Sequence, residues 1–256
     1  MEYIQERFGQ GVDEVNILKL GDTHSGHPNY IESLVDDALS TIVNRPNGRI
    51  FLMGDLCEMS LTNSVGSVYE QILSPEDQID YWVDKLKPYK DIIIGGVSGN
   101  HEQRAINSVG MSPLRLIFKI LDIQDKFYGY SAMVKYSFNK GCIHDYNVHG
   151  STGARTKGGI LNKMYKLKDI AEADIYSMGH THQLITDDTE IRAIPDSRNM
   201  KINDRRYYYV NTGSALAWSE SYAEMKNYPK TLLGFPIIRM TGERGYQNVE
   251  LEKITL

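Results

Sequence analysis

Cysteine and tryptophan are scarce in this chain of 256 residues, which has two of each. The two cysteines, Cys57 and Cys142, cannot build a disulfide framework, and so few thiols fit a reducing compartment. No uninterrupted apolar run approaches the ~18 residues that a membrane-spanning helix needs. The first residues also lack the basic start and apolar core of a signal peptide. We therefore expect a cytoplasmic protein without a membrane partner.

The chain also has no Pro/Gly/Ser-rich linker, no internal repeat and no low-complexity run. A chain of this length can form one large domain or two small ones, and without a linker a single domain over residues 1–256 is favoured. The net charge of -5 argues against a protein that coats nucleic acid through its overall field, although it leaves room for a local basic groove.

In the first half of the chain, short apolar runs alternate with helical patterns. The runs end at glycine or Ser-Gly and predict buried strands over residues 15–20, 49–53 and 91–97. Helices are predicted over 29–44, with Asn29 as a candidate N-cap, from Ser74-Pro75 to near Pro88, and over 113–121. Strand, helix and strand in succession indicate parallel pairing.

The second half of the chain has a different pattern. Residues 130–138 and 142–148 predict a hairpin around Asn139-Lys140-Gly141, followed by a helix over 158–170 and a strand over 174–178. The stretch 183–211 is rich in residues that favour strands. Together the two halves predict an α/β protein in which two mixed sheets pack face to face beneath outer helices.

Five of the seven histidines lie in short segments that also hold Asp, Asn or Gly. These segments, together with one further Gly-Asp pair, are Gly21-Asp22-Thr23-His24, Gly54-Asp55, Gly99-Asn100-His101-Glu102, His149-Gly150 and Gly179-His180-Thr181-His182. Most of them follow a predicted strand. Since ligands collect at the carboxyl ends of strands in α/β sheets, the side chains can converge on one edge. The competing interpretation is that each segment is an ordinary turn.

Imidazole and carboxylate groups in this arrangement suit divalent transition ions. Two such ions lie ~3.5–4 Å apart and need a bridging group, for which the carboxylate of Asp55 is the natural candidate. Asp22 and His24 can chelate one ion because alternate side chains of an extended segment share a face. The amide of Asn100 is a neutral ligand, which limits the negative charge around the ions.

This combined pattern resembles the calcineurin-like metallophosphoesterase family. The match spans residues 21–182, and 210–214 is similar to the family's late glycine-serine turn. The resemblance implies a four-layer αββα sandwich of two mixed β-sheets flanked by helices, with the metal site at the C-terminal ends of strands. It also implies two divalent ions, with manganese expected and iron or zinc as alternatives. One ion would bind Asp22, His24, Asp55 and His182, and the other would bind Asp55, Asn100, His149 and His180.

The activity expected from this resemblance is phosphoester hydrolysis by a hydroxide that bridges the metals. His101 is not needed as a ligand, so we expect it to be the general acid or a donor to the transition state. Glu58 matches the position of an acid that orients this histidine in some relatives, and the alternative is a solvated loop acid. Arg104, close behind His101, is a candidate for contact with the substrate phosphate.

The protein Ser/Thr phosphatase branch carries arginines where this chain has Met59 and Ser98. Arginine side chains bind a dianionic monoester through two parallel hydrogen bonds. Because this chain lacks both arginines, a phosphodiesterase is favoured, such as a nuclease or a nucleotide phosphodiesterase. The expected partner is a phosphoester, including nucleotides and nucleic acid, and the oligomeric state is left open. The alternatives are a phosphomonoesterase on a small molecule and a weakly active, metal-bearing binding scaffold.

Three further segments bear on substrate binding. Five basic residues over 155–168 either steer a polyanion or form a solvated helix face, and the second interpretation is favoured. Tyr207-Tyr208-Tyr209 predicts sheet packing rather than a stacking platform. Residues 61–90 and the tail after Asn211 are expected to shape the substrate cleft.

Overall fold

The computed structural model describes residues 1–9, 11–61, 64, 68–138, 141–219, 222–225, 227–243 and 246–256. Every strand in these ranges belongs to one of two sheets. The six-stranded sheet has the order β1 (Glu2–Arg7), β5 (Ser131–Phe138), β6 (Gly141–Val148), β7 (Ile175–Met178), β9 (Lys201–Thr212) and β8 (Leu184–Asp196). The five-stranded sheet has the order β11 (Tyr246–Thr255), β10 (Gly234–Glu243), β2 (Glu14–Leu20), β3 (Gly48–Leu52) and β4 (Ile93–Gly96).

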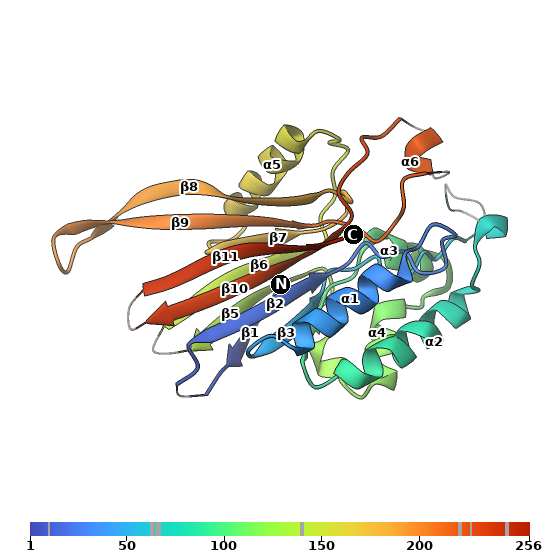
Figure 1. Cartoon of the computed structure of the whole chain (residues 1–256), viewed down its shortest axis with the longest axis horizontal. Helices are drawn as coiled ribbons and strands as arrows, with labels where there is room; N and C mark the ends of the chain where they lie inside the picture. The colour runs from blue at the N-terminus through green and yellow to red at the C-terminus, as the bar shows by residue number, and fades with distance from the viewer. Residues whose placement is uncertain are drawn as a thin grey trace.

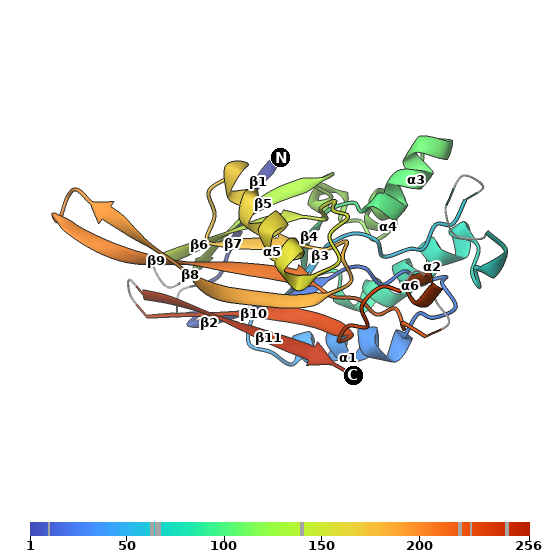
Figure 2. The ribbon, with the colours of Figure 1, turned by 90° about the horizontal axis from the view of Figure 1, so that it is seen from above.

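Three hydrophobic clusters define four layers, which Figures 1 and 2 show from two directions. The first cluster packs the helices α1 (Glu32–Val43), α2 (Pro75–Leu86) and α4 (Pro113–Ile120) on the five-stranded sheet. The second lies between the sheets, and the third packs α5 (Lys157–Tyr165) on the six-stranded sheet. The predicted αββα sandwich is therefore confirmed. The single domain over residues 1–256 stays a prediction.

Both sheets are mixed, as predicted. In the five-stranded sheet β2, β3 and β4 run parallel, and β10 pairs antiparallel with β2. In the other sheet β6, β7 and β9 run parallel, β5 is parallel to β1 but antiparallel to β6, and β8 is antiparallel to β9. The β8–β9 hairpin extends well beyond the other strands in both views. Because β2, β3 and β4 run parallel to one another, and β6 runs parallel to β7, the carboxyl ends of these strands face one end of the sandwich.

The predicted start of the second helix is confirmed in atomic detail. The Ser74 side chain accepts a hydrogen bond from the backbone N–H of Asp77, and the Asp77 carboxylate accepts one from the backbone N–H of Ser74. Pro75 follows at the first helical position, where its missing N–H costs no hydrogen bond. The remaining described helices are α3 (Asn100–Val109) and α6 (Tyr222–Met225), with short 3-10 turns at Val68–Glu70, Lys87–Tyr89, Gln124–Lys126 and Lys166–Asp169.

Some local predictions were wrong or incomplete. Helix α1 begins at Glu32, and its N-cap position belongs to Ile31 rather than to Asn29. Asn29 instead donates to the Ser219 carbonyl at 2.7 Å, which ties it to the late loop. Helix α3 and the strands β1, β10 and β11 were not predicted. The predicted hairpin is confirmed, although Asn139 and Lys140 of its turn lie outside the described residues.

None of the helices in the described part of the chain combines the length and the apolar character that a bilayer crossing requires.

Candidate metal centre

The seven predicted ligands gather at the end of the sandwich where the parallel strands finish. Asp22 follows β2, Asp55 follows β3, Asn100 follows β4, His149 follows β6, and His180 and His182 follow β7. Asn100 is also the first residue of α3, so this ligand sits at a helix start rather than in a free loop. The convergence predicted from strand order is therefore observed.

The first group of potential ligands is Asp22, His24 and His182, whose donor atoms all lie within 4.8 Å of one another. The Nε2 atoms of His24 and His182 are 2.9 Å apart, and His182 Nε2 is 3.6 Å from Asp22 Oδ1. His24 Nδ1 donates to the Glu58 carboxylate at 3.0 Å, so its Nε2 presents a lone pair to His182. Two ring nitrogens that face each other so closely are disposed to share a cation.

The second group is Asp55, His149 and His180, joined by the amide of Asn100. Asn100 Oδ1 lies 2.7 Å from His180 Nδ1 and 3.1 Å from His149 Nε2. His149 Nε2 is also 3.2 Å from Asp55 Oδ2, while its Nδ1 donates to the Met53 carbonyl at 2.8 Å. That carbonyl fixes the tautomer that a metal-binding imidazole needs. The division of ligands agrees with the one the resemblance implies, and the sharing of Asp55 by both groups stays a prediction.

The backbone at these ligands is strained. Five of the seven have a positive φ: Asp22 at 51°, His24 at 53°, Asp55 at 50°, His180 at 71° and His182 at 57°. Residues other than glycine rarely adopt this left-handed conformation, and each case costs about 1–3 kcal/mol. Strain of this kind persists where the surroundings enforce it and clusters at functional sites. It turns consecutive side chains toward one point, which an extended loop cannot do.

The ligand loops also pack so tightly that one glycine cannot be replaced without disruption. A Cβ on Gly99 would lie 2.1 Å from Asp55 Oδ1 and 2.5 Å from the Asp55 backbone nitrogen. The glycine before Asn100 therefore permits the loop after β4 to contact the loop after β3. This gives a physical reason for the Gly-Asn-His spacing seen in the sequence.

Two residues that hold the ligands in place were missed as site residues. The buried carboxylate of Glu102 accepts hydrogen bonds at 2.9 Å from the backbone N–H groups of Asp55, Leu56 and Gly99. Thr212 Oγ1 donates to Asp22 Oδ2 at 2.9 Å. The spacing of Gly99 and Glu102 is that of a helix capping box, a signal that could have found Glu102.

Asp55 and His149 form an ion pair in the metal-free protein. Burial opposes the charge of Asp55, yet His149 outweighs burial and lowers the pKa of this carboxyl well below its ordinary value. Burial likewise favours neutral His149, but the Asp55 carboxylate raises the pKa of this imidazole to about 10. A metal ligand must be deprotonated, so a cation that binds here displaces the imidazolium proton.

His101 and Arg104 lie beside this group on α3. His101 Nδ1 donates to the Glu58 carbonyl at 2.6 Å, and its Nε2 is 4.0 Å from Asp55 Oδ2. Arg104 Nη2 donates to that Nε2 at 3.0 Å. Burial is the main reason why the pKa of His101 falls to about 4, so the ring is neutral near pH 7.

Glu58 is buried rather than a solvated loop acid. Its carboxylate contacts His24 at 3.0 Å and lies 3.6 Å from His101 Nδ1, which makes a third group of possible metal donors. The closest carboxylate contact is therefore with His24, while the backbone carbonyl of Glu58 is what fixes His101. Burial raises the pKa of Glu58, but the hydrogen bond from His24 outweighs it and lowers the value to about 2.

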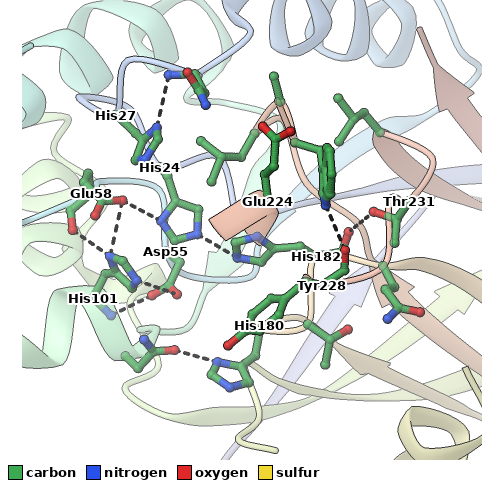
Figure 3. Close-up of a pocket in the computed structure, with 18 of the residues that line it drawn as sticks. His24, His27, Asp55, Glu58, His101, His180, His182, Glu224, Tyr228 and Thr231 are labelled. Carbon is green, nitrogen blue, oxygen red and sulfur yellow. Dashed lines mark hydrogen bonds and ion pairs between the residues drawn. The ribbon is translucent and has the colours of Figure 1, made fainter. Parts of the chain in front are cut away.

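These groups open into a cavity of about 1120 Å³. In Figure 3, His24, Glu58 and His101 lie on one side and Thr231 on the other, with His182 between them and Tyr228 beside His180. Glu70, Gln71 and several residues between 216 and 233 line the cavity, in keeping with the expectation that segment 61–90 and the tail after Asn211 shape the substrate cleft.

Among the basic residues of 155–168, Arg155 lines the cavity, whereas Lys168 pairs with Glu190. Tyr207, Tyr208 and Tyr209 are buried, as predicted for packing.

The order of the layers agrees with the αββα sandwich that the resemblance implies. No family model and no curated protein matches this chain. Solved structures with a similar fold include vacuolar protein sorting 29 from Cryptosporidium parvum, with 15% identity, a TM-score of 0.44, and coverage of 95% of this chain and 100% of that chain.

A metallophosphoesterase from Sphaerobacter thermophilus has 14% identity and a TM-score of 0.47, with 94% of this chain and 88% of that chain covered. A zinc complex of Vps29 from Entamoeba histolytica has 16% identity and a TM-score of 0.40, with 94% and 99% covered. Identities and scores this low assign no activity to this chain, so its function has to be inferred from its own site.

Proposed function

We propose that this protein is a metal-dependent phosphoester hydrolase that uses two divalent ions, with manganese as the preferred metal and iron or zinc as alternatives. The observation that carries the proposal is the pair of donor groups at the strand ends. Their imidazole, carboxylate and amide atoms lie within a few ångströms of one another beside a cavity, and these are the atom types that bind divalent transition ions.

The residues suited to hold the ions are Asp22, His24 and His182 in one group and Asp55, His149 and His180 in the other. Asn100 adjoins the second group, and we propose that Asp55 is shared by both ions. When bound, such ions neutralise phosphate oxygens and supply a nucleophilic hydroxide at neutral pH. These residues fit divalent ions because of the atoms that they leave free to bind a metal. His24 and His149 both commit Nδ1 to a protein acceptor, which leaves Nε2 for a cation.

The protein side chains around the ions orient the ester and handle the leaving group. Arg104 brings a fixed positive charge next to His101 in the lining of the cavity, which suits a phosphate oxygen. His101 Nε2 is directed at the same part of the cavity as Arg104. A bound phosphoester anion would raise the pKa of this imidazole, since a nearby opposite charge favours the protonated form. His101 then acts as the acid for the leaving oxygen or as a donor to the transition state.

Diester hydrolysis is the favoured subtype, including nucleotide phosphodiesterase and nuclease activity. Met59 and Ser98 occupy the positions of the protein phosphatase arginines, and both are buried, so neither supplies an arginine fork for a monoester dianion. Phosphomonoester hydrolysis is the second candidate. A cytoplasmic location stays a prediction.

The test uses protein that has been stripped of metal and reloaded with manganese, iron(II) or zinc. Bis-p-nitrophenyl phosphate and p-nitrophenyl phosphate report diester and monoester hydrolysis by the same chromophore. We expect metal-dependent turnover with the diester preferred, loss of turnover in His180→Ala, and normal turnover in the matched control His144→Ala, since His144 lies outside the cavity and pairs with Asp174. Two bound metals without hydrolysis of any phosphoester would instead identify a binding scaffold.

A further inference from the structure

The cavity is larger than hydrolysis of a small phosphate ester requires. Its volume of about 1120 Å³ slightly exceeds that of sites that enclose whole drug-sized ligands, about 300–1,000 Å³. One wall consists of the polar strand ends. The opposite wall comes from the segment between β9 and β10, and it includes Leu216, Trp218, Tyr228 and Leu233. A ligand that fills this space therefore has a phosphate at one end and an apolar group at the other.

Two partly exposed aromatic rings in this wall are held in place by specific contacts. Trp218 Nε1 donates to the Tyr228 carbonyl at 2.9 Å, which fixes the indole to the neighbouring turn. The guanidinium of Arg155 lies 4.0 Å from the Tyr228 ring centroid and donates to its hydroxyl at 3.0 Å. Rings that are already positioned lose little entropy when a planar ligand stacks on them.

The aromatic wall is tied directly to the loop that carries His180 and His182. Thr231 Oγ1 donates to the His182 carbonyl at 3.2 Å, and Gln183 Nε2 donates to the Arg155 carbonyl at 2.7 Å. Figure 3 shows Tyr228 and Thr231 next to these histidines. A ring stacked on the wall and a phosphate at the metal ligands can thus belong to one small molecule.

The charge around the cavity suits a small ligand better than a polymer. Glu70 and Glu224 contribute to its lining, and the chain as a whole carries a net charge of -5. Arg104 and Arg155 are the arginines in the lining, enough for one phosphate group. A long nucleic acid would need a continuous basic track to offset its phosphates, and these acidic groups work against one.

We propose that the substrate is a small phosphodiester of the nucleotide type, whose heteroaromatic base stacks on the wall formed by Trp218 and Tyr228. This inference rests on the proposed hydrolase function and adds the substrate class. It assigns binding roles to two residues that no sequence motif marks.

The kinetic test compares two esters that release the same p-nitrophenolate: the p-nitrophenyl ester of thymidine 5′-monophosphate and methyl p-nitrophenyl phosphate. We expect the manganese-loaded protein to prefer the nucleoside ester in kcat/KM. Trp218→Leu and Tyr228→Leu should each lower that preference by about 5- to 100-fold, the range that base stacking on an aromatic side chain provides. Trp218→Phe, which keeps a ring, should retain much of it. Tyr3→Leu is the matched control on the distant strand β1.

A binding measurement separates this inference from the hydrolase proposal. Because Trp82 is fully buried, Trp218 is the indole that a ligand in the cavity can quench. Adenosine 5′-monophosphate should quench fluorescence in the native protein and not in Trp218→Leu, whereas ribose 5-phosphate should have no effect.

Each outcome decides between the two proposals. Hydrolysis of both esters at equal kcat/KM, or an unchanged preference in folded Trp218→Leu, would overturn the substrate class and leave the hydrolase intact. Quenching by the nucleotide without hydrolysis of either ester would support the base-binding wall and overturn the hydrolase. A strong preference for single-stranded oligonucleotides over the nucleoside ester would overturn the small-molecule assignment in favour of a polymer.

Discussion

Two regions of this protein bury charged side chains, and they do so in opposite ways. Between the sheets, Lys19 donates to Asp145 and Asn147, and the other oxygen of Asp145 accepts from Ser177. At the strand ends, by contrast, imidazoles and carboxylates gather with their acceptor atoms facing one another. The first region pairs one ammonium with one carboxylate, and the second concentrates atoms that can bind a metal beside the cavity.

The backbone conformation also differs between the two regions. Lys19, Asp145 and Ser177 lie on regular strands, whereas five of the seven candidate ligands hold a left-handed conformation. Buried charge that is paired within regular structure contributes to a unique fold or is neutral. Acids and imidazoles that are crowded together on strained backbone indicate a site for something outside the chain. The comparison therefore predicts that mutations in the two regions will have different consequences.

The largest effect is expected for Asp55→Asn. The substitution removes the charge between the two donor groups, so transition-state stabilisation of several kcal/mol is lost, a fall in kcat/KM of about 10³-fold or more. Thermal stability of the metal-free protein should fall, because His149 loses the carboxylate with which it pairs, but the loss is limited because the imidazole can release its proton. Steady-state kinetics and metal analysis measure both effects, and near-normal turnover with one metal lost would exclude Asp55 as a shared ligand.

The opposite pattern is expected for Asp145→Ala. This change leaves the Lys19 ammonium buried without its counter-charge, which costs about 3–5 kcal/mol of unfolding free energy. Urea unfolding should show this loss, while kcat/KM below the unfolding midpoint stays close to normal. The double change Lys19→Met with Asp145→Leu should recover much of the stability. A selective loss of turnover in Asp145→Ala would mean that the two regions are coupled.

A third prediction concerns His101→Ala. If His101 protonates the leaving oxygen, turnover should fall by about 10²-fold for an ester with an alkyl leaving group. The loss should be much smaller for p-nitrophenolate, which leaves without a proton. Equal losses for both esters would assign His101 to binding alone. Metal content should match that of the native protein, which also tests the third donor group that His101 forms with His24 and Glu58.

The smallest effect is expected for Thr212→Val. The hydroxyl of Thr212 holds Asp22 through one hydrogen bond, and partners of this kind are worth about 10- to 100-fold in metal affinity. Competition with a metal chelator measures the change. Thr241→Val on β10 serves as the control, since this residue lies on the far end of the sandwich. Equal affinity in both variants would show that Asp22 does not need this support.

The sequence was sufficient to predict the layers and the convergence of the candidate ligands, because both depend on local signals. Apolar runs mark the strands β2, β3 and β4, and Asp22, Asp55 and Asn100 come within a few residues of their ends. Strands β1 and β11 were missed because their polar sequences show little apolar alternation. Helix α3 was missed because its first turn consists of Asn100, His101 and Glu102, which resemble a ligand loop.

The contacts within the site could not be predicted from the sequence. Whether Glu58 reaches His24 or His101 depends on the left-handed turn at His24, and residue order does not reveal φ. The wall of Trp218 and Tyr228 depends on how the segment after β9 folds back over the cavity. Nothing in its local composition distinguishes it from an ordinary surface loop.

The left-handed turns also determine which inactive forms of this protein will fold well enough to study. Asparagine and aspartate tolerate positive φ better than other side chains with a Cβ. Amide replacements at Asp22 and Asp55 therefore preserve the loop shape while lowering the affinity for cations. Bulkier or β-branched residues would distort the ligand loops at the strand ends. A stalled protein of that kind, incubated with nucleotide esters, is the natural starting material for capturing an intact substrate complex in crystals.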